Sequence, residues 1–159
     1  MAQTPRRSDA RRNGERIVAA AVAAFADGGP QLRLEDLAAR AGVGVATVYR
    51  LFDGRDGLVR AAFEAVFEAQ VEPVAQAAGA EPDPAAGLRA ALSGTVEALA
   101  EHRALFRAAR ESGVIRVDTT ERYLRDLDDV LGAAQRAGAV RPDVSLRDLA
   151  AVLVMVTAV

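Results

Sequence analysis

The stretch LEDLAARAGVGVATVYRLF, residues 34–52, decides the fold of this chain. Apolar residues at helical spacing predict a short helix over residues 34–41. Gly42 then predicts a tight turn, because the backbone there must leave the ordinary helical dihedrals. A second short helix is expected over residues 45–51, and one end of it is too polar to be pure core. Two short helices around a glycine turn are the layout of a DNA-reading helix-turn-helix.

The second of these helices has the residues needed to enter a DNA major groove, which is about 12 Å wide. Small side chains at its start allow a close approach, and Val45, Ala46, Thr47 and Arg50 meet this demand. Val45 can contact a thymine methyl group, and Arg50 can read guanine or hold a phosphate. On spacing alone, an ordinary helical hairpin with a glycine turn remains an alternative.

The composition of the 159 residues predicts an all-α protein. Apolar residues make up 51% of the chain, and the prevalence of Ala with Leu, Arg and Glu is typical of packed helices. The chain has no Cys and one His, which excludes thiolate and multi-histidine metal sites. The sequence has no paired nucleophile and base and no phosphate loop. We therefore expect no enzymatic activity, no cofactor and no metal.

Charge is distributed unevenly along the chain, whose formal net charge is -2. Residues 1–60 hold 10 Arg against 7 acidic residues, whereas residues 61–159 hold 10 Arg against 15 acidic residues. The front of the molecule is therefore the part expected to meet a polyanion such as DNA. A solvated helical face could show the same imbalance.

A further helix is expected before the motif, from about residue 12. Ile17, Ala21 and Phe25 recur at helical spacing, and the segment 27–30 stops the helix with Gly and Pro. Residues 1–11 are predicted to form a disordered basic arm. Such an arm either follows the DNA backbone or minor groove or serves as a solubilising tail.

Beyond the motif, the apolar spacing predicts several helices separated by segments that contain Gly and Pro. Their expected ranges are about 55–79, 83–102, 104–112, 119–137 and 145 onward. Asp83 as N-cap and Pro84 open one of them, and Ser145 with Asp148 resembles a capping box at the start of the last. That last helix is apolar as far as Val159, so we expect the chain to continue or this face to be buried in a partner.

The run from Arg16 to Phe67 resembles the N-terminal domain of TetR-family transcriptional regulators. The resemblance rests on the opening helix with IVAAA, on LEDLAARAGVG, and on ATVYRLF followed by a long connecting helix. It implies a three-helix DNA-binding domain over residues 12–56. It also implies a helical effector-binding and dimerisation domain over residues 57–159, incomplete at its C-terminal end.

The resemblance also implies roles for individual residues. Thr47 and Tyr49 match positions that touch phosphates or bases in the family, and Arg55 stands where a Lys commonly holds a phosphate. Leu51 departs from a frequent His, and Val45 departs from a frequent Lys or Thr, so the operator sequence cannot be transferred. The residues predicted to contact DNA are Arg33, Val45, Ala46, Thr47, Tyr49, Arg50 and Arg55.

In the family, the C-terminal helices enclose a ligand pocket and pair with a second subunit. Apolar and aromatic residues at helical spacing are the expected pocket walls, with a few polar side chains to orient a ligand. The residues so predicted are Phe63, Phe67, Leu92, Val96, His102, Arg103, Phe106, Arg107, Tyr123 and Met155. Ordinary core packing is the alternative for the apolar members, and two inward-facing Arg side chains would favour an anionic effector.

Together these features predict a cytoplasmic homodimer that binds a palindromic double-stranded DNA operator. It would repress transcription until a small-molecule effector releases it. A helical adaptor that kept the fold without specific DNA binding is the alternative. The sequence shows no signal peptide and no apolar run of about 20 residues, so no membrane partner is expected.

Overall fold

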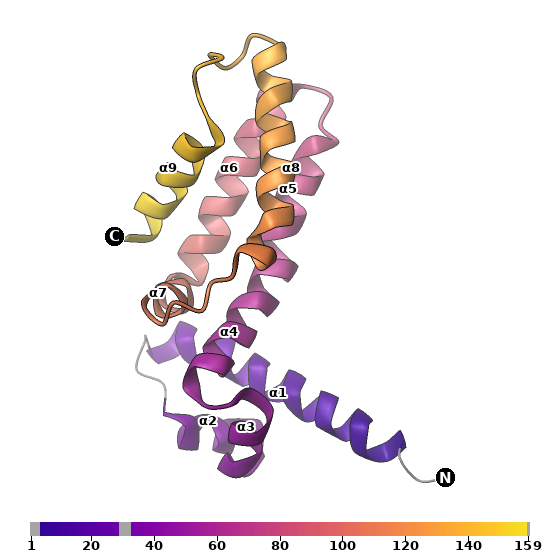
Figure 1. Ribbon diagram of the computed structural model, residues 1–159, viewed down its shortest axis with the longest axis vertical. Helices are drawn as coiled ribbons and strands as arrows, with labels where there is room; N and C mark the ends of the chain where they lie inside the picture. The colour runs from indigo at the N-terminus through magenta and orange to yellow at the C-terminus, as the bar shows by residue number, and fades with distance from the viewer. Residues whose placement is uncertain (1–3, 29–32, 159) are drawn as a thin grey trace. The chain divides into compact units, whose positions relative to one another are not determined.

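The computed structural model describes residues 4–28 and 33–158, and the chain divides into two compact units. Unit 1 comprises Met1–Ala65 and Ala104–Ile115, and unit 2 comprises Val66–Arg103 and Arg116–Val159. All regular secondary structure in the described residues is helical (Figure 1). The predicted all-α fold class is confirmed.

Unit 1 holds all or most of five helices. They are α1 (Thr4–Gly28), α2 (Leu34–Ala41), α3 (Val45–Phe52), α4 (Arg55–Val66) and α7 (Arg103–Glu111). The apolar stripes of these helices meet in a core that buries Ile17, Phe25, Leu37 and Val48. The rings of Phe63 and Phe106 pack edge to face with centroids 5.3 Å apart, which is a favourable aromatic geometry and joins α4 to α7.

The boundaries of α2 agree with the prediction, and α3 extends one residue further than predicted. Val48 is fully buried, whereas Leu51 and Phe52 are half-buried. The reason is their place at the end of a short helix. Residues 1–3 of the expected arm and the stop expected at residues 29–30 lie outside the described residues.

The predicted disordered arm is wrong for its described part, because α1 is helical from Thr4 (Figure 1). Exposed ion pairs bridge successive turns of this segment. Nη1 of Arg11 lies 3.1 Å from Oε1 of Glu15, and Nη2 of Arg12 lies 2.7 Å from Oδ1 of Asp9. Pairs at these spacings stabilise an isolated helix by about 0.2–0.5 kcal/mol each, so they support a helix that buries little.

The division into units differs from the boundary expected after residue 56. α4 belongs to unit 1 because its apolar residues, Leu58 and Val59 among them, are buried. Residues 104–115, expected in the C-terminal domain, also belong to unit 1 through α7. Asp53 and Gly54 end a helix, but this pair does not show which core the next helix joins.

The long helix predicted over residues 55–79 consists of three segments. α4 is followed by η1 (Phe67–Val71), a π-helical stretch, and by α5 (Glu72–Gly79). Pro73 lies in the first turn of α5. Proline has no N–H and its ring collides with the carbonyl four residues earlier, so the preceding turn must widen to continue the helix.

Unit 2 combines η1 and α5 with α6 (Pro84–Glu101), α8 (Val117–Arg136) and α9 (Leu146–Ala158). α5, α6 and α8 pack side by side, and α9 lies along α6 and α8 (Figure 1). A Cβ atom on Gly94 would lie 2.8 Å from Cγ1 of Val74, so the absence of a side chain permits the close approach of α6 to α5.

Both predicted helix caps in unit 2 are present. The side chain of Asp83 accepts a hydrogen bond from the main-chain N–H of Ala85 at 3.0 Å, at the start of α6. At the start of α9, the N–H of Ser145 donates to Oδ2 of Asp148 at 2.8 Å, and the N–H of Asp148 donates to Oγ of Ser145 at 3.3 Å. This reciprocal pair is a capping box.

Candidate nucleic-acid interface

The turn between α2 and α3 is built around Gly42. This residue has φ 65° and ψ 39°, and its N–H bonds back to the last turn of α2. A Cβ atom here would lie 2.8 Å from Nη2 of Arg16, and the left-handed conformation itself disfavours other residues. The guanidinium of Arg16 donates a 2.6 Å hydrogen bond to the carbonyl oxygen of Ala41. The glycine therefore leaves room for the side chain that holds α1 against the end of α2.

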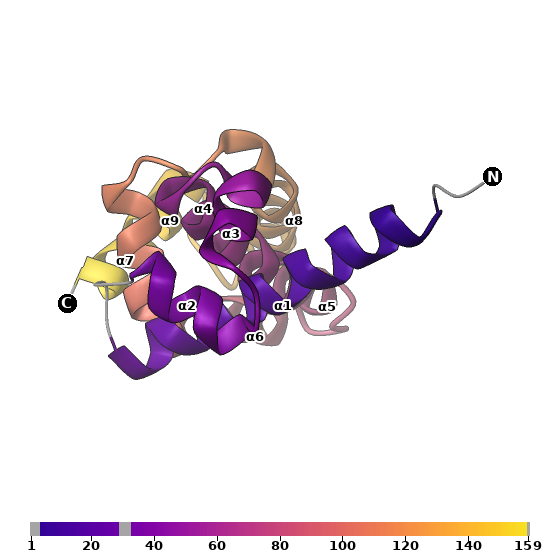
Figure 2. The ribbon, with the colours of Figure 1, turned by 90° about the horizontal axis from the view of Figure 1, so that it is seen from below.

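α3 presents one face to the core and the rest to the surface. Val48 is the only residue of this helix that is buried. Gly44 at the N-cap provides no side-chain hydrogen bond, so the first turn of α3 is not covered by a capping side chain. Val45 is 37% exposed and Tyr49 is 53% exposed. In Figure 2, which views the ribbon from below, α3 lies in front, toward the viewer.

The link from α3 to α4 is unusually tight. Asp53 and Gly54 both have positive φ, 54° and 96°, and the next helix starts at once. A Cβ atom on Gly57 would lie 1.6 Å from the carbonyl oxygen of Phe52, which no side chain could tolerate without backbone movement. Gly57 thus lets the first turn of α4 approach the last turn of α3. This contact holds α3 at a defined angle to α4.

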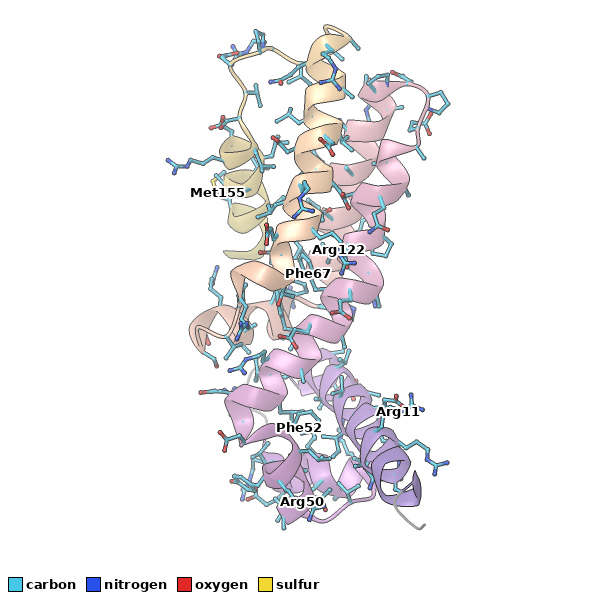
Figure 3. All side chains as sticks on the ribbon, turned by 45° about the vertical axis from the view of Figure 1, so that its right-hand side comes forward. Arg11, Arg50, Phe52, Phe67, Arg122 and Met155 are labelled. Carbon is cyan, nitrogen blue, oxygen red and sulfur yellow. The ribbon has the colours of Figure 1, made fainter. Side chains whose placement is uncertain are left out.

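The structure brings most of the predicted DNA-contacting residues together. Five of them lie on α3: Val45, Ala46, Thr47, Tyr49 and Arg50. Ala46 and Arg50 are exposed, and Thr47 is half-buried. Arg50 lies at the far end of unit 1 in Figure 3. Their contact with DNA stays a prediction.

The two remaining predicted residues lie at the starts of the neighbouring helices α2 and α4. Arg55 is half-buried at the start of α4, with its Nη1 atom 3.9 Å from Oδ1 of Asp56. Arg33 is exposed at the N-cap of α2, forms no capping hydrogen bond, and lies 3.9 Å from Glu35. Both are cations that are at least partly exposed, which suits contact with phosphates.

Sequence reasoning missed the supporting residues Arg16 and Gly57. Both act through contacts between helices. Arg16 bonds to the end of α2, which is distant in sequence, and Gly57 allows the close junction of α3 with α4. For Gly57 a signal existed, because glycine inside a helical pattern suggests a close backbone approach. For Arg16 the sequence carried no such signal.

Unit 2 contains three polar pairs at or near its core. Oγ1 of Thr95 and the hydroxyl of Tyr123 lie 3.0 Å apart and both residues are buried. Nε2 of His102 lies 2.9 Å from Oε1 of Gln70, a residue of η1. A third pair joins the buried carboxylate of Glu72 to Arg122, and Figure 3 shows Arg122 beside the ribbon near Phe67.

Tyr123 is enclosed by its neighbours in unit 2. Its ring meets that of Phe67 edge to face, with centroids 5.6 Å apart. Burial raises the pKa of Tyr123 above its ordinary value, and the hydrogen bond with Thr95 opposes this rise only in part. The phenol therefore stays protonated and shares one hydrogen bond with a threonine hydroxyl inside an apolar helical bundle.

The residues predicted for a ligand pocket fall into three sets. Those buried in the two units are Phe63, Phe67, His102, Phe106 and Tyr123. Leu92 and Val96 are half-buried on α6. Arg103, Arg107 and Met155 are exposed, the last of them by 61%. Sequence reasoning did not single out the buried Glu72 and Thr95 or the exposed Gln70 and Arg122, because a polar residue in a helix gives no sign of its partner until the helices are packed.

The described residues also bear on membrane and metal binding. Within the described part of the chain, no helix is both long enough and apolar enough to cross a membrane. The same residues contain no cluster of three or more His, Asp or Glu side chains arranged to hold a metal ion.

A helix-turn-helix with an exposed second helix, joined to an all-helical unit, defines the class of DNA-binding transcriptional regulators. The sequence model described as "Bacterial regulatory proteins, tetR family" matches residues 17–62. The model described as "Transcriptional regulator SbtR-like, C-terminal domain" matches residues 83–159. A search among curated proteins found no match.

Solved structures are similar over nearly the whole chain. A TetR transcription regulatory protein from Mycobacterium vanbaalenii is 33% identical, with a TM-score of 0.66 over 94% of this chain and 91% of that one. A TetR transcriptional regulator from Streptomyces coelicolor is 31% identical, with a TM-score of 0.60 over 91% and 85%. The fatty acid degradation regulator FadR from Bacillus halodurans shares the fold at 18% identity, with a TM-score of 0.73 over 91% and 80%. This chain belongs to the TetR family of transcriptional regulators.

Proposed function

We propose that this protein is a homodimeric repressor that binds a palindromic operator and is released from it by a small-molecule effector. The observation that carries the proposal is the surface of α3, where Val48 is buried and Val45, Ala46, Tyr49 and Arg50 are exposed. Two copies of α3 would occupy successive major grooves, with half-sites about 34 Å apart or slightly more.

Specific contacts in this proposal divide between bases and phosphates. Val45 and Ala46, at the exposed start of α3, would contact base edges such as a thymine methyl group. Arg50 would read guanine or hold a phosphate, while Tyr49 and Arg55 would hold phosphates on either side. Thr47 and Arg33 would add further backbone contacts. Small side chains at the start of α3 support this division, because they let the helix approach the base pairs.

Effector binding is proposed for unit 2. Buried hydroxyl and imidazole groups lie among apolar walls there, a combination found in ligand sites. Tyr123, His102 and Phe67 would contact the effector from three different elements. Leu92 and Val96 would complete the wall on α6. We expect the effector to bind more tightly to a conformation in which the two recognition helices no longer fit the operator. The difference between its binding free energies for the two conformations sets how far operator affinity falls.

The decisive experiment is selection of bound duplexes from a random DNA library by the full chain, repeated over a series of salt concentrations. We expect a palindromic consensus, and an affinity that falls steeply with salt because arginine contacts release counterions. Arg50→Ala should lower affinity by about 10-fold, given about 1–3 kcal/mol for a good base contact. Tyr49→Ala should lower it by a similar factor, since a hydrogen bond to a charged group contributes about 1.5–3 kcal/mol. Arg89→Ala, an exposed arginine on α6, serves as the control and should have no effect.

Other outcomes would contradict the proposal. Weak binding without a consensus would indicate a helical adaptor that uses the fold without reading DNA. A consensus without two-fold symmetry would contradict binding as a symmetric homodimer. If the Arg50→Ala and wild-type proteins bound the palindrome equally well, the result would contradict the proposal that α3 reads the operator.

A further inference from the structure

The first turns of α1 form a helical extension ahead of the core of unit 1. α1 starts at Thr4, and among its residues 9–17, whose side chains the structure describes, Ile17 is the first that is buried. The intervening residues would span about 18 Å at the helical rise of 1.5 Å per residue. In Figures 1 and 2 this part of α1 projects beyond α2 and α3, which pack against its later turns.

This extension is rich in arginine. Arg6, Arg7, Arg11 and Arg12 all lie on it. The side chains of Arg11 and Arg12 are 75% and 66% exposed. Each makes one ion pair within α1, and such exposed pairs are weak enough to exchange for a phosphate. Residues 9–12 of this segment are all exposed, so Arg11 and Arg12 have no role in packing the core.

The extension is joined rigidly to the DNA-reading motif. Arg16 follows Arg12 by one turn and donates its hydrogen bond to Ala41 at the end of α2. The base of the extension is therefore fixed against the helix-turn-helix, and a continuous helix carries Arg11 and Arg12 outward from there. Figure 3 shows Arg11 standing at the side of unit 1, away from Arg50 on α3.

We propose that residues 4–12 of α1 form a helical arm that contacts DNA phosphates beyond the base pairs read by α3. The inference rests on the proposed function, since it assumes that α3 occupies a major groove. It adds a second interaction surface to the same unit. The partner is the double-stranded DNA backbone, which carries one negative charge per about 1.7 Å of helix axis and offers phosphates at any position that the arm reaches.

The arm contributes affinity without sequence preference. Contacts to phosphates position a protein on the duplex but do not read bases. Loss of the arm therefore lowers binding to an operator and to unrelated duplex DNA by the same factor. The number of arginine contacts appears in the salt dependence, since each phosphate contact adds about 0.9 to the slope of log affinity against log salt.

The first test measures binding of the full chain to a duplex of arbitrary sequence over a salt series. The variant Arg11→Ala with Arg12→Ala should lose about 1.8 from the slope for each bound protomer. Arg125→Ala is the matched control, because Arg125 is equally exposed and pairs with Glu121 at the same i,i+4 spacing as Arg11 with Glu15. Equal slopes for the double variant and wild type would overturn the proposal.

A second test separates a helical arm from a flexible basic tail. Gly14 lies within α1, and a Cβ atom there would meet nothing within 4 Å. Gly14→Ala should stiffen the helix and raise affinity by up to about fivefold, whereas Gly14→Pro should break the helix and lower affinity with the charge unchanged. Unchanged affinity in both variants would overturn the helical arm. Hydrogen exchange of the residues from Ile17 onward would check that unit 1 stays folded in the proline variant.

A third test distinguishes failure of the arm from failure of the proposed function. Duplexes that share one selected half-site core but carry short or long flanks are compared. Wild type should bind the long-flank duplex more tightly, and the Arg11 and Arg12 double variant should not distinguish the two. If no consensus is selected, the proposed function fails, but the salt slopes on arbitrary DNA still test the arm. A flank preference equal in both proteins would count against the arm alone.

Discussion

Nη2 of Arg16, on α1, lies 2.6 Å from the main-chain carbonyl oxygen of Ala41, the last residue of α2. The carbonyls of the last helical turn lack partners within the helix, and they lie at the negative end of the helix dipole. A guanidinium satisfies one of these carbonyls and complements that dipole. The side chain fits there because Gly42 has no Cβ atom. One contact thus joins α1 to the turn that precedes the recognition helix.

Replacement of Arg16 by Ala should lower the free energy of unfolding of unit 1 by about 1 kcal/mol, since it removes a charge-assisted hydrogen bond to a partly buried carbonyl. Denaturant unfolding and hydrogen exchange of the α2 amides would measure the loss. Arg40→Ala is the control, because the pair of Arg40 with Asp27 is exposed and should contribute little. Equal effects of the two changes would show that the Ala41 contact has no special weight.

Replacement of Gly57 by Ala should destabilise unit 1 by about 3 kcal/mol or more. The new methyl group would lie 1.6 Å from the carbonyl oxygen of Phe52, so the backbone between α3 and α4 must shift. DNA affinity should fall as well, because α3 would lose its angle to α4. Gly14→Ala, which adds the same methyl group in open space, should leave stability unchanged or raise it. A Gly57→Ala protein as stable as wild type would contradict the close approach.

The buried pair of Thr95 and Tyr123 should behave as a coupled unit in a double-mutant cycle. Thr95→Val alone or Tyr123→Phe alone should cost about 1–3 kcal/mol, since each leaves a buried hydroxyl without its partner. The double variant should cost less than the sum of the two single changes, because no polar group is left unpaired. Thermal unfolding of the four proteins would measure the coupling. If the two single losses of stability simply added, the two hydroxyls would not be coupled, and water would already satisfy their hydrogen bonds.

The raised pKa of Tyr123 predicts a loss of stability in alkali. The unfolded chain releases the phenolic proton near its ordinary pKa of about 10, whereas the folded chain retains it to a higher pH. The contribution is therefore complete below pH about 10 and is lost as the pH rises toward the folded pKa. Denaturant midpoints at pH 8 to 11 should fall less steeply for Tyr123→Phe than for Tyr49→Phe, whose exposed ring serves as the control. Identical profiles would argue against a confined phenol.

The capping box at the start of α9 predicts a change in the acid range. Hydrogen bonds from the side chain and then the backbone of Ser145 lower the pKa of Asp148 below its ordinary value. Its stabilising effect is therefore present above the unfolded pKa and is lost as the pH falls through the folded pKa, below about 4. Amide exchange in α9 should accelerate in this range, and Ser145→Ala should show fast exchange already at pH 7. An unchanged exchange rate in Ser145→Ala would show that packing alone holds this end of the helix.

Much of this architecture was predictable because its signals are local. The apolar spacing and Gly42 were enough for α2 and α3, and Asp83 and Ser145 marked two helix starts correctly. Of the seven predicted DNA-contacting residues, five lie on α3, and Arg33 and Arg55 lie at the starts of α2 and α4. Local patterns succeed there because a helix, its cap and its turn involve residues within a few positions of one another.

Long-range features escaped the sequence for the same reason. The helix predicted over residues 55–79 took no account of Pro73, and the π-helical form of η1 depends on how α5 continues into the bundle. The start of α1 was predicted to be disordered because its composition is polar and rich in arginine. The weak exposed ion pairs that support a helix there did not outweigh that composition in the prediction. Placement of α7 in unit 1 required the contact between Phe63 and Phe106, which are far apart in the chain.

The amino-acid sequence by itself determined the class of this protein: a helix-turn-helix of the TetR type on an all-helical chain. That information lies in short-range spacing, which sets the helices, their caps and the glycine turn. Only the tertiary structure decided which polar groups meet, namely Arg16 with Ala41, Thr95 with Tyr123, and Gln70 with His102. These pairs join residues from 25 to 32 positions apart, and their contact follows from helix packing, which buries whole faces and leaves each polar group to find the partner that packing brings near.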